Sequence, residues 1–228
     1  MIFVSCGIIS SASSSSAMVR YVLHYFRFHG RAEATRLAFK LAGVDYQEKY
    51  IEWPSAEWEE CKQRYPTQQV PVLEVDGKII GQSKAILRYV GREFGLYGKT
   101  SLDAAYIDQA IDTAEDIWAA VNDTYVGTKE QQAAKTKTFL TEVVPPVYAS
   151  LDRQFAVEPA GEYIVGNSIT IADLFFFTAV DFVNFVSRGA NSLEKFPKLT
   201  TLKSRIASDP KIAAWLAERP PEPPYQPE

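Results

Sequence analysis

The chain has 228 residues, 46% of them hydrophobic and 23% charged, a composition that suits one large or two small globular domains and excludes disordered, collagen-like and coiled-coil chains. Its 24 basic and 28 acidic residues give a net charge of -4 without any basic block, so no nucleic-acid partner is expected. Two cysteines and two histidines without ligand spacing argue against a disulfide framework and a metal site, and no apolar run approaches the roughly 20 residues that span a bilayer.

Residues 1–17 precede the first predicted strand and are interpreted as a disordered or targeting extension. A secretory signal requires a basic start and a longer apolar centre, and a transit peptide requires arginines. The first basic residue is Arg20. We therefore expect a disordered extension on a cytoplasmic protein, with targeting as the alternative.

Hydrophobic periodicity predicts alternating strands and helices between residues 18 and 98. The expected elements are a strand at 19–25, a helix at 31–42, a strand at 45–51, a short helix at 55–65, strands at 70–75 and 78–80, and a helix at 83–94. Gly43 is expected to cap the first helix, Asp76-Gly77 to form a hairpin turn, and Ser83 to cap the last helix. The order βαβαββα indicates a thioredoxin-like domain with a mixed four-stranded sheet.

Helical periodicity dominates from Leu102 onward, after a linker at 95–98. Helices are expected at 102–126, 130–155, 171–187 and 196–216, with Pro145-Pro146 kinking or breaking the second. The Pro-rich stretch at 220–228 is expected to be extended. The predicted fold class is therefore α/β + all-α: a thioredoxin-like domain at 18–98, an all-α domain at 99–219 and a tail.

The end of the first strand carries the first candidate for chemistry. Thioredoxin-like redox proteins place Cys-x-x-Cys there, but this chain has Tyr25-Phe26-Arg27-Phe28, which excludes dithiol exchange. A phenol donates a hydrogen bond at neutral pH, and donation to a thiol favours the reactive thiolate. Packing of Tyr25 at a strand edge is the alternative.

Two further segments could bind a peptide-like ligand. A cis Val70–Pro71 bond would present the Val70 N–H and C=O to an extended ligand as an added strand. Gln82-Ser83 opens a helix, where free amides and a hydroxyl can hold a carboxylate. An ordinary strand start and an ordinary helix cap are the alternatives.

Five motifs occur in order with matching gaps: Tyr25-Phe26-x-x-x-Gly30-Arg31-Ala32-Glu33, Trp58-x-x-x-Lys62, Gln69-Val70-Pro71, Gln82-Ser83-x-Ala85-Ile86 and Gly166-Asn167-Ser168-Ile169-Thr170-Ile171-Ala172-Asp173. The last contains the capping-box pattern Thr170 to Asp173. Over about residues 18 to 216 the chain thus resembles a cytosolic glutathione S-transferase of the tyrosine type. The resemblance is closest to the sigma class of prostaglandin D synthases and S-crystallins.

The resemblance implies that Tyr25 donates to the glutathione sulfur and that the charge of Arg31 lowers the thiol pKa further. It also implies contacts with the rest of glutathione: Gln69, Val70 and cis Pro71 at the cysteinyl backbone, Gln82 and Ser83 at the γ-glutamyl end, and Trp58 and Lys62 at the glycyl end. Asp116 is implied to reach the glutathione of a partner subunit, which predicts a homodimer.

For the second substrate, the resemblance implies a hydrophobic pocket formed by Phe26, Trp118 and Phe175. Phe176 and Phe177 are interpreted as core, and His24 and His29 as residues without partners. The function implied is transfer of glutathione, the co-substrate, to hydrophobic electrophiles without a metal. Two alternatives stay open: a glutathione-dependent isomerase of prostaglandin-like endoperoxides, and a non-catalytic ligand-binding or crystallin-like protein.

Overall fold

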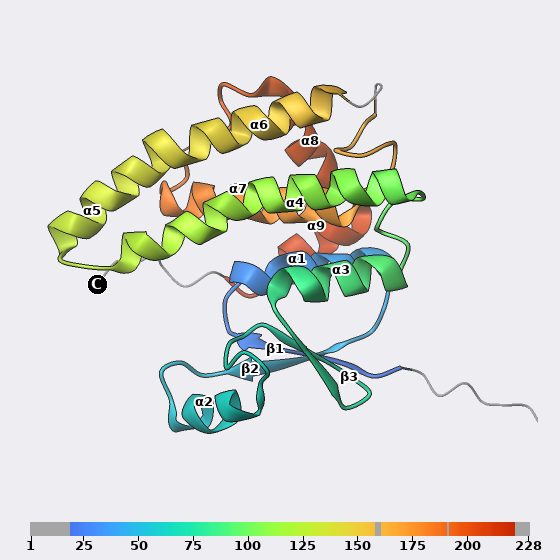
Figure 1. Cartoon of the computed structure of the whole chain (residues 1–228), viewed down its shortest axis with the longest axis vertical. Helices are drawn as coiled ribbons and strands as arrows, with labels where there is room; N and C mark the ends of the chain where they lie inside the picture. Colours follow the sequence, from blue (N-terminus) through green and yellow to red (C-terminus); the bar gives the residue numbers. More distant parts are fainter. Residues whose placement is uncertain (1–18, 158–160, 191, 222–228) are drawn as a thin grey trace, which may run out of the picture.

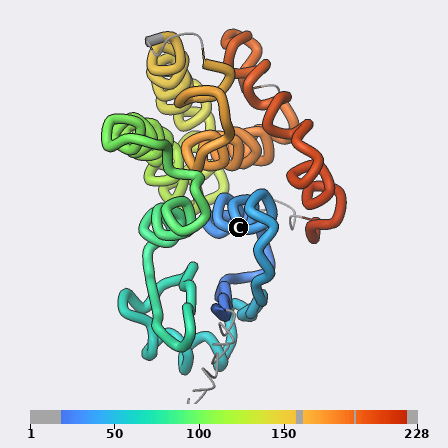
Figure 2. The backbone as a smooth tube through the Cα atoms, turned by 90° about the vertical axis from the view of Figure 1, so that its right-hand side faces the viewer, coloured from blue at the N-terminus to red at the C-terminus, as the bar shows by residue number. Residues whose placement is uncertain are grey.

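The computed structural model describes residues 19–157, 161–190 and 192–221, so the expected extension at 1–17 and most of the Pro-rich tail lie outside the described residues. A small sheet lies beneath two helices, and a larger group of helices lies above them (Figure 1). The tube in Figure 2 shows the same two parts from the side, joined through the helices between them.

The sheet has four strands in the order β2-β1-β3-β4. Their bounds are Tyr21–Phe26 for β1, Gln47–Ile51 for β2, Val72–Val75 for β3 and Lys78–Gly81 for β4. β1 pairs parallel with β2 and antiparallel with β3, and β3 pairs antiparallel with β4. The mixed sheet expected from the element order is confirmed, and so is the hairpin at Asp76-Gly77, where both residues have positive φ.

Three α-helices belong to this domain: α1 (Glu33–Ala42), α2 (Ala56–Cys61) and α3 (Ser83–Glu93). Helices α1 and α3 lie side by side between the sheet and the helical domain (Figures 1 and 2). Gly43 caps α1 in the left-handed conformation, as predicted. The prediction that Ser83 caps α3 was wrong: β4 ends at Gly81, so Gln82 alone turns the chain, with φ 71°, and Ser83 falls inside the helix.

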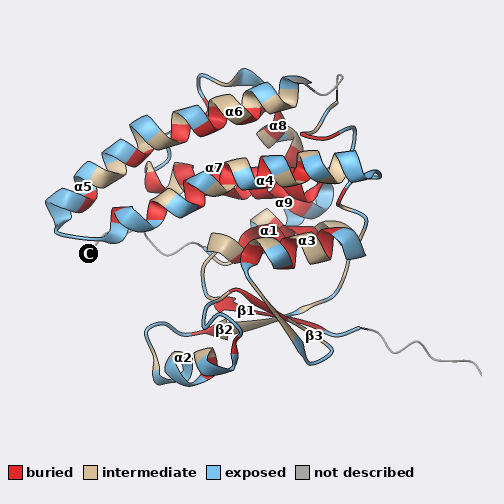
Figure 3. Ribbon diagram, viewed as in Figure 1, coloured by how far each residue is buried: buried red, intermediate tan, exposed pale blue. Residues whose placement is uncertain are grey.

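The described part of the second domain is built from α4 (Ser101–Val121), α5 (Lys129–Thr138), α6 (Val144–Val157), α7 (Ile171–Val186), α8 (Pro197–Ala207) and α9 (Pro210–Glu218). Helix α7 is the most deeply buried, as its red colour in Figure 3 shows, and it contacts α1, α4 and α8. Its capping box forms as predicted between Thr170 and the fully buried Asp173. None of the helices in the described ranges is long and apolar enough to cross a membrane.

Two helices differ from their predicted form. The interruption expected at Pro145-Pro146 occurs one turn earlier, as a π-helical turn at Phe139–Val143, because the prolines have no N–H to donate to the preceding turn. The single helix expected at 196–216 is instead two helices. Asp209 accepts hydrogen bonds from the Lys211 and Ile212 amides and Pro210 follows it, so a new helix starts there.

The last helix is bound tightly to the first. The carboxylate of Glu33, at the start of α1, is buried and accepts hydrogen bonds from Trp215 Nε1 at 2.9 Å and Arg219 Nη1 at 3.0 Å. Its second oxygen pairs with Arg36 at 3.1 Å. In addition, Lys211 Nζ of α9 donates to the carbonyl of Leu41. These contacts hold the helical domain against the helix that leads away from Tyr25.

Candidate active site

Tyr25 lies near the end of β1 and is 5% exposed. Its hydroxyl oxygen accepts a hydrogen bond of 3.0 Å from the backbone N–H of Arg31. The chain reverses between them through Gly30, which has φ 44°. The first turn after the strand therefore folds back over the hydroxyl and sets its position.

Gly30 is required at this turn for a steric reason. A Cβ atom at position 30 would lie 2.5 Å from the Tyr25 hydroxyl and 2.9 Å from the Phe28 ring. Real side chains do not approach this closely, and positive φ is also unfavourable for residues with a Cβ. Glycine thus allows the backbone to approach the phenol.

Arg31 connects this turn to the helical domain. Its Nη1 lies 2.8 Å from Glu115 Oε1, its Nη2 donates to the carbonyl of Trp118 at 2.9 Å, and its Cζ lies 5.7 Å from the centroid of the Trp118 ring. The second oxygen of Glu115 is buried without a hydrogen-bond partner among the described residues. The backbone of Arg31 therefore contacts the Tyr25 hydroxyl, whereas its guanidinium group pairs with a carboxylate of α4.

Three predicted segments meet at one edge of the sheet. His24 of β1 is opposite Val72 of β3, and Val72 is opposite Gly81 of β4. By this register, the Tyr25 end of β1, the Val70-Pro71 segment and the Gln82-Ser83 segment share the same edge. The sheet topology thus brings together residues separated by up to 58 positions, from Tyr25 to Ser83.

Unpaired main-chain groups are concentrated along that edge. The Val70–Pro71 bond is cis, as predicted, and within the described chain the Val70 N–H and C=O have no backbone partner. At the start of α3 the first intrahelical donor is the Ile86 amide, which bonds to the Gln82 carbonyl, so the preceding amides have no helical acceptor. Such groups can bind the main chain and carboxylate of a peptide ligand.

The residues predicted for the glycyl end lie on and after α2. Ser55 caps this helix by accepting from the Trp58 amide at 3.0 Å. The Trp58 ring meets the edge of the Phe26 ring at a centroid distance of 5.4 Å, and Lys62 Nζ lies 2.5 Å from Glu59 Oε2. Trp58 is therefore next to the strand end that carries Tyr25, and Lys62 Nζ lies 5.9 Å from the centroid of the Trp58 ring.

A cavity of about 630 Å³ opens beside the Tyr25 turn, between the two domains. One wall is aromatic: Trp118 of α4 stacks on Phe182 of α7 at 4.5 Å, and Phe185 lies next to Phe182. His29 and Gly30 line the side near Tyr25. We call this space the aromatic cavity. It can hold an apolar molecule close to the Tyr25 turn.

The second-pocket residues expected from the sequence are only partly at this cavity. Trp118 lines it, whereas Phe26 packs with Phe28 and Trp58 and is not among its lining residues. Phe175 is 3% exposed in the core and does not line it, like Phe176 and Phe177. Phe182 and Phe185 line the cavity but were not predicted from the sequence, although they follow Thr178 at helical spacing on the same face of α7.

The expectation that both histidines lack partners was wrong. His24 Nδ1 lies 2.9 Å from the hydroxyl of Tyr65, and its Nε2 lies 3.6 Å from Glu74. Burial lowers the pKa of His24, which favours the neutral ring. His29 Nε2 lies 2.7 Å from the carbonyl of Pro220. Within the described ranges no three His, Cys, Asp or Glu side chains form a group that could hold a metal ion.

Asp116 lies on α4, two residues before Trp118, and is exposed. It has no ion pair or hydrogen bond to another described residue, unlike its neighbour Glu115, which pairs with Arg31. Its carboxylate is therefore available to a molecule outside the chain. This is the arrangement that a contact with a partner's ligand requires.

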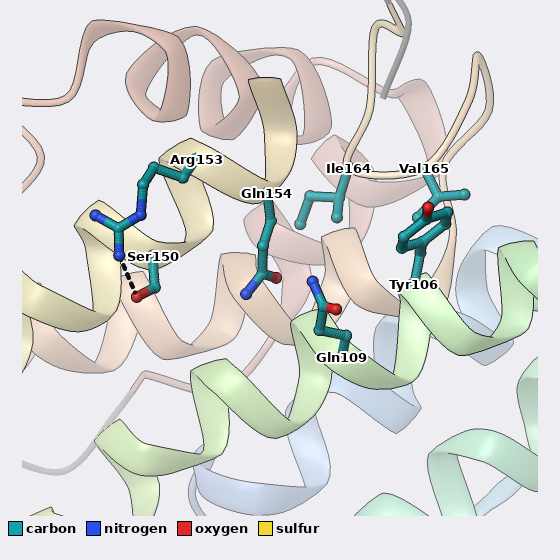
Figure 4. Close-up of a pocket in the computed structure, with 7 residues that line it drawn as sticks. All are labelled: Tyr106, Gln109, Ser150, Arg153, Gln154, Ile164 and Val165. Carbon is teal, nitrogen blue, oxygen red and sulfur yellow. Dashed lines mark hydrogen bonds between the residues drawn. The ribbon is translucent and has the colours of Figure 1, made fainter. Parts of the chain in front are cut away.

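A separate cavity of about 280 Å³ lies between α4, α6 and the segment at residues 164–165. Figure 4 shows the amides of Gln109 and Gln154 facing each other across it, with Arg153 bonded to Ser150. All of its lining residues belong to the helical domain. It is therefore distinct from the Tyr25 site.

Comparisons with known proteins agree with this arrangement. The family model described as the N-terminal domain of glutathione S-transferase matches residues 21–92, and the model of its C-terminal domain matches residues 111–219. Hematopoietic prostaglandin D synthase of Gallus gallus is 37% identical over 211 residues, which are 89% of this chain and 98% of that protein. S-crystallin SL11 of Nototodarus sloanii is 34% identical with the same coverage.

Solved structures agree as well. The structure titled rat hPGDS complexed with a quinoline has a TM-score of 0.80 at 29% identity and covers 89% of this chain and 98% of its own. The prostaglandin synthase D of Nilaparvata lugens has a TM-score of 0.79 at 29% identity, covering 89% of this chain and all of its own. The similarity therefore extends through both domains.

Proposed function

Because the chain belongs to the glutathione S-transferase family, we propose that it is a glutathione transferase that adds the glutathione thiolate to hydrophobic electrophiles. Residues 18–98 would bind glutathione along the sheet edge, and residues 99–219 would hold the electrophile. The observation that carries the proposal is the position of the Tyr25 hydroxyl, held by the Arg31 amide beside the aromatic cavity.

Tyr25 would act on the thiol. Its O–H donates to the sulfur and stabilises the thiolate relative to the thiol, which raises the fraction of nucleophile at neutral pH. The proton can leave to water. Arg31 would add positive charge to the same turn, moderated by its pair with Glu115 at 2.8 Å.

The rest of glutathione would lie along the sheet edge. The free N–H and C=O of Val70 suit the cysteinyl main chain, and the unpaired amides at the start of α3 suit the γ-glutamyl carboxylate. The proposed contacts are Gln69, Val70 and Pro71 in the middle, Gln82 and Ser83 at one end, and Trp58 and Lys62 at the glycyl end. Lys62 would turn from Glu59 to the ligand carboxylate.

The electrophile would occupy the aromatic cavity. Trp118 and Phe182 form a stacked aromatic pair in its lining. Gly30 also lines the cavity and lies against the Tyr25 hydroxyl, so the electrophile would be close to the thiolate. Binding both reactants side by side supplies much of the rate by proximity. We place the acceptor on Trp118, with Phe26 closer to glutathione than to the acceptor.

We also propose a homodimer in which Asp116 reaches the glutathione amine bound to the partner subunit. The support is the exposed, unpaired carboxylate of Asp116 on α4. Sedimentation equilibrium of the full chain measures the mass. In Asp116→Asn, the KM for glutathione should rise while a dimer mass is retained.

A glutathione-dependent isomerase of prostaglandin-like endoperoxides is the second candidate, favoured by the 37% identity to a hematopoietic prostaglandin D synthase. The test compares three readouts on one preparation: retention on immobilised glutathione, conjugation of chlorodinitrobenzene, and conversion of prostaglandin H to prostaglandin D. S-methylglutathione, which has no free thiol, should compete for binding without reacting.

Conjugation with retention supports the transferase. Retention with isomerisation alone identifies the isomerase. Retention without either reaction favours a ligand-binding protein like the S-crystallins, to one of which the chain is 34% identical. Absence of both retention and turnover would overturn the proposal.

A further inference from the structure

The loop between β2 and α2 carries an exposed tryptophan. Trp53 is 64% exposed, the highest fraction among the large hydrophobic side chains of the described ranges. Figure 1 shows α2, which follows this loop, beneath the sheet on the side away from the helical domain. A single exposed apolar side chain is ordinary on a protein surface, so only the surroundings of Trp53 can indicate a role.

Trp53 is the outer member of a group of aromatic rings beside Tyr25. Its ring centroid lies 6.2 Å from that of Phe26, which in turn lies 5.4 Å from Trp58 and 5.6 Å from Tyr25. These separations are in the range of favourable aromatic contacts. We call Phe26, Trp53 and Trp58 the aromatic shelf. It extends from the Tyr25 ring to an indole that is open to solvent.

The backbone of the loop holds Trp53 in a defined place. Ser55 Oγ donates to the carbonyl of Glu52 at 2.6 Å and accepts from the Trp58 amide at 3.0 Å. One hydroxyl thus closes the turn around Trp53 and joins it to the helix that carries Trp58. A residue on a backbone held in this way loses less conformational entropy when it binds a ligand than a residue on a free loop.

The aromatic shelf is separate from the aromatic cavity. Among the described residues, those that line the cavity do not include Phe26, Trp53 or Trp58. Trp58 and Lys62 are instead assigned to the glycyl end of glutathione under the proposed function. A group attached beyond the glycyl residue would therefore meet the shelf, whereas an electrophile attached to the sulfur would lie in the cavity.

We propose that the aromatic shelf selects glutathione-like peptides that continue past the glycyl residue into an aromatic side chain. The inference rests on the proposed function, because it takes the glutathione site as its starting point. Glutathione itself would end before Trp53. One further residue extends the chain by about 3.5 Å, and its ring can then pack against the exposed indole. One exposed ring is far smaller than a stable protein interface, which favours a ligand of this size.

The test is isothermal titration calorimetry of the full chain with glutathione, γ-Glu-Cys-Gly-Ala and γ-Glu-Cys-Gly-Phe. The two tetrapeptides have the same charge and backbone and differ only in the ring. Trp53→Leu removes the indole, and Trp53→Phe keeps a smaller ring. The control Tyr125→Leu removes a ring that is 44% exposed and belongs to neither the shelf nor the cavity lining. Far-UV circular dichroism verifies that each variant is folded.

We expect the natural protein to bind the phenylalanine peptide about two- to tenfold more tightly than the alanine peptide, the contribution of one aromatic pair. This ratio of affinities should fall toward unity in Trp53→Leu, because the partner ring is lost. It should be partly retained in Trp53→Phe and unchanged in Tyr125→Leu.

Equal affinity of the natural protein for the two tetrapeptides, or an equal loss of the ratio in Trp53→Leu and Tyr125→Leu, would overturn the proposal. If glutathione still binds, the proposed function is unaffected by that result. A ratio that is lost in Trp118→Leu and kept in Trp53→Leu would also overturn it, because the added ring would then occupy the aromatic cavity. Absence of glutathione binding would overturn both this proposal and the proposed function.

Discussion

The hydroxyl oxygen of Tyr25 lies 3.0 Å from the backbone nitrogen of Arg31, which donates to it. A hydrogen bond into a phenol oxygen polarises its O–H and makes it a better donor. The oxygen accepts from the backbone of a turn, so its environment depends on the conformation that Gly30 gives this turn.

Tyr25→Phe removes this hydroxyl. A hydrogen bond to a charged group contributes about 1.5–3 kcal/mol, so the apparent pKa of bound glutathione should rise by about 1–2 units. Turnover near neutral pH should fall about 10- to 100-fold with little change in glutathione affinity. The pH profile of kcat/KM measures both, with Tyr50→Phe as control. An unmoved profile would show that another group activates the thiol.

Gly30→Ala should affect activity through geometry. The new methyl would lie 2.5 Å from the Tyr25 hydroxyl, and a displacement of about 1 Å can reduce the rate about 100-fold. Gly43→Ala is the matched control: its φ is also positive, but the new methyl meets only Lys211 Nζ at 3.4 Å. Both variants should lose about 1 kcal/mol of unfolding free energy from the positive φ; Gly30→Ala should lose more than this because of its close contacts, and only Gly30→Ala should lose turnover. Equal turnover in the two would contradict the steric argument.

Trp118→Leu should weaken binding of the electrophile. The variant removes an aromatic ring from the lining of the cavity; an aromatic contact with the electrophile is worth about 0.5–1.5 kcal/mol, so its loss should raise the KM for chlorodinitrobenzene up to about tenfold. The KM for glutathione should stay constant. Trp53→Leu, at a tryptophan that is 64% exposed, should leave both constants unchanged. A rise in the KM for glutathione alone would show that Trp118 does not contribute to binding of the electrophile.

Asp173→Ala should destabilise the fold strongly. Its carboxylate accepts from the Ile164 amide at 2.9 Å and from the amide and hydroxyl of Thr170 at 2.8 Å each. Unsatisfied buried donors cost about 1–3 kcal/mol each, so a loss of about 3–5 kcal/mol is expected. Asp103→Ala, in the solvent-exposed capping box of α4, should cost much less, because water can satisfy the amides that it leaves unpaired. Urea unfolding compares them, and equal losses would argue against burial as the cause.

Glu33→Gln should reduce stability by about 3 kcal/mol at neutral pH because it breaks a buried ion pair. Burial by itself raises the pKa of Glu33, but Arg36, His29 and Arg219 hold it below the ordinary value of 4.5. The ionised carboxylate therefore stabilises the fold above pH 4.5, and this contribution is lost as the pH falls through the lowered pKa.

The difference in unfolding free energy between the natural protein and Glu33→Gln should accordingly shrink as the pH falls below 4.5. Urea titrations at several pH values measure it. Glu60→Gln, an exposed glutamate without an ion pair in the described chain, should show no such dependence. A constant difference for Glu33→Gln would exclude the ion pair as its source.

Much of this arrangement is predictable from local sequence. Gly43 follows a helical pattern and caps it, Asp76-Gly77 separates two apolar runs and makes the hairpin, and Thr170 stands three residues before Asp173 and forms the capping box. Each depends on neighbours in the chain, so each is visible there. The break in the last predicted helix was also indicated by the sequence, as Asp209-Pro210, but helical periodicity on both sides concealed it.

The residues that line the aromatic cavity were harder to predict from the sequence. Residues 174–177 of α7 are all apolar, so periodicity does not indicate which face meets α4. Phe182 lines the cavity because the partially exposed end of α7 faces Trp118, a consequence of packing between helices. Gln82 turned the chain in place of Ser83 because β4 and α3 are one residue apart, a distance that only the paired strands define.

The hydrogen bonds between Glu33 and the C-terminal residues Trp215 and Arg219 have a consequence for biosynthesis. Its carboxylate is joined to Arg219, 186 positions later, so a chain leaving the ribosome exposes Glu33 early and its last partner almost at the end. Until then the start of α1, which continues the Tyr25 turn, has a carboxylate with only part of its counter-charge. A nascent N-terminal domain therefore has the strands of the site but not its final support, and the site is completed only when the last helix docks.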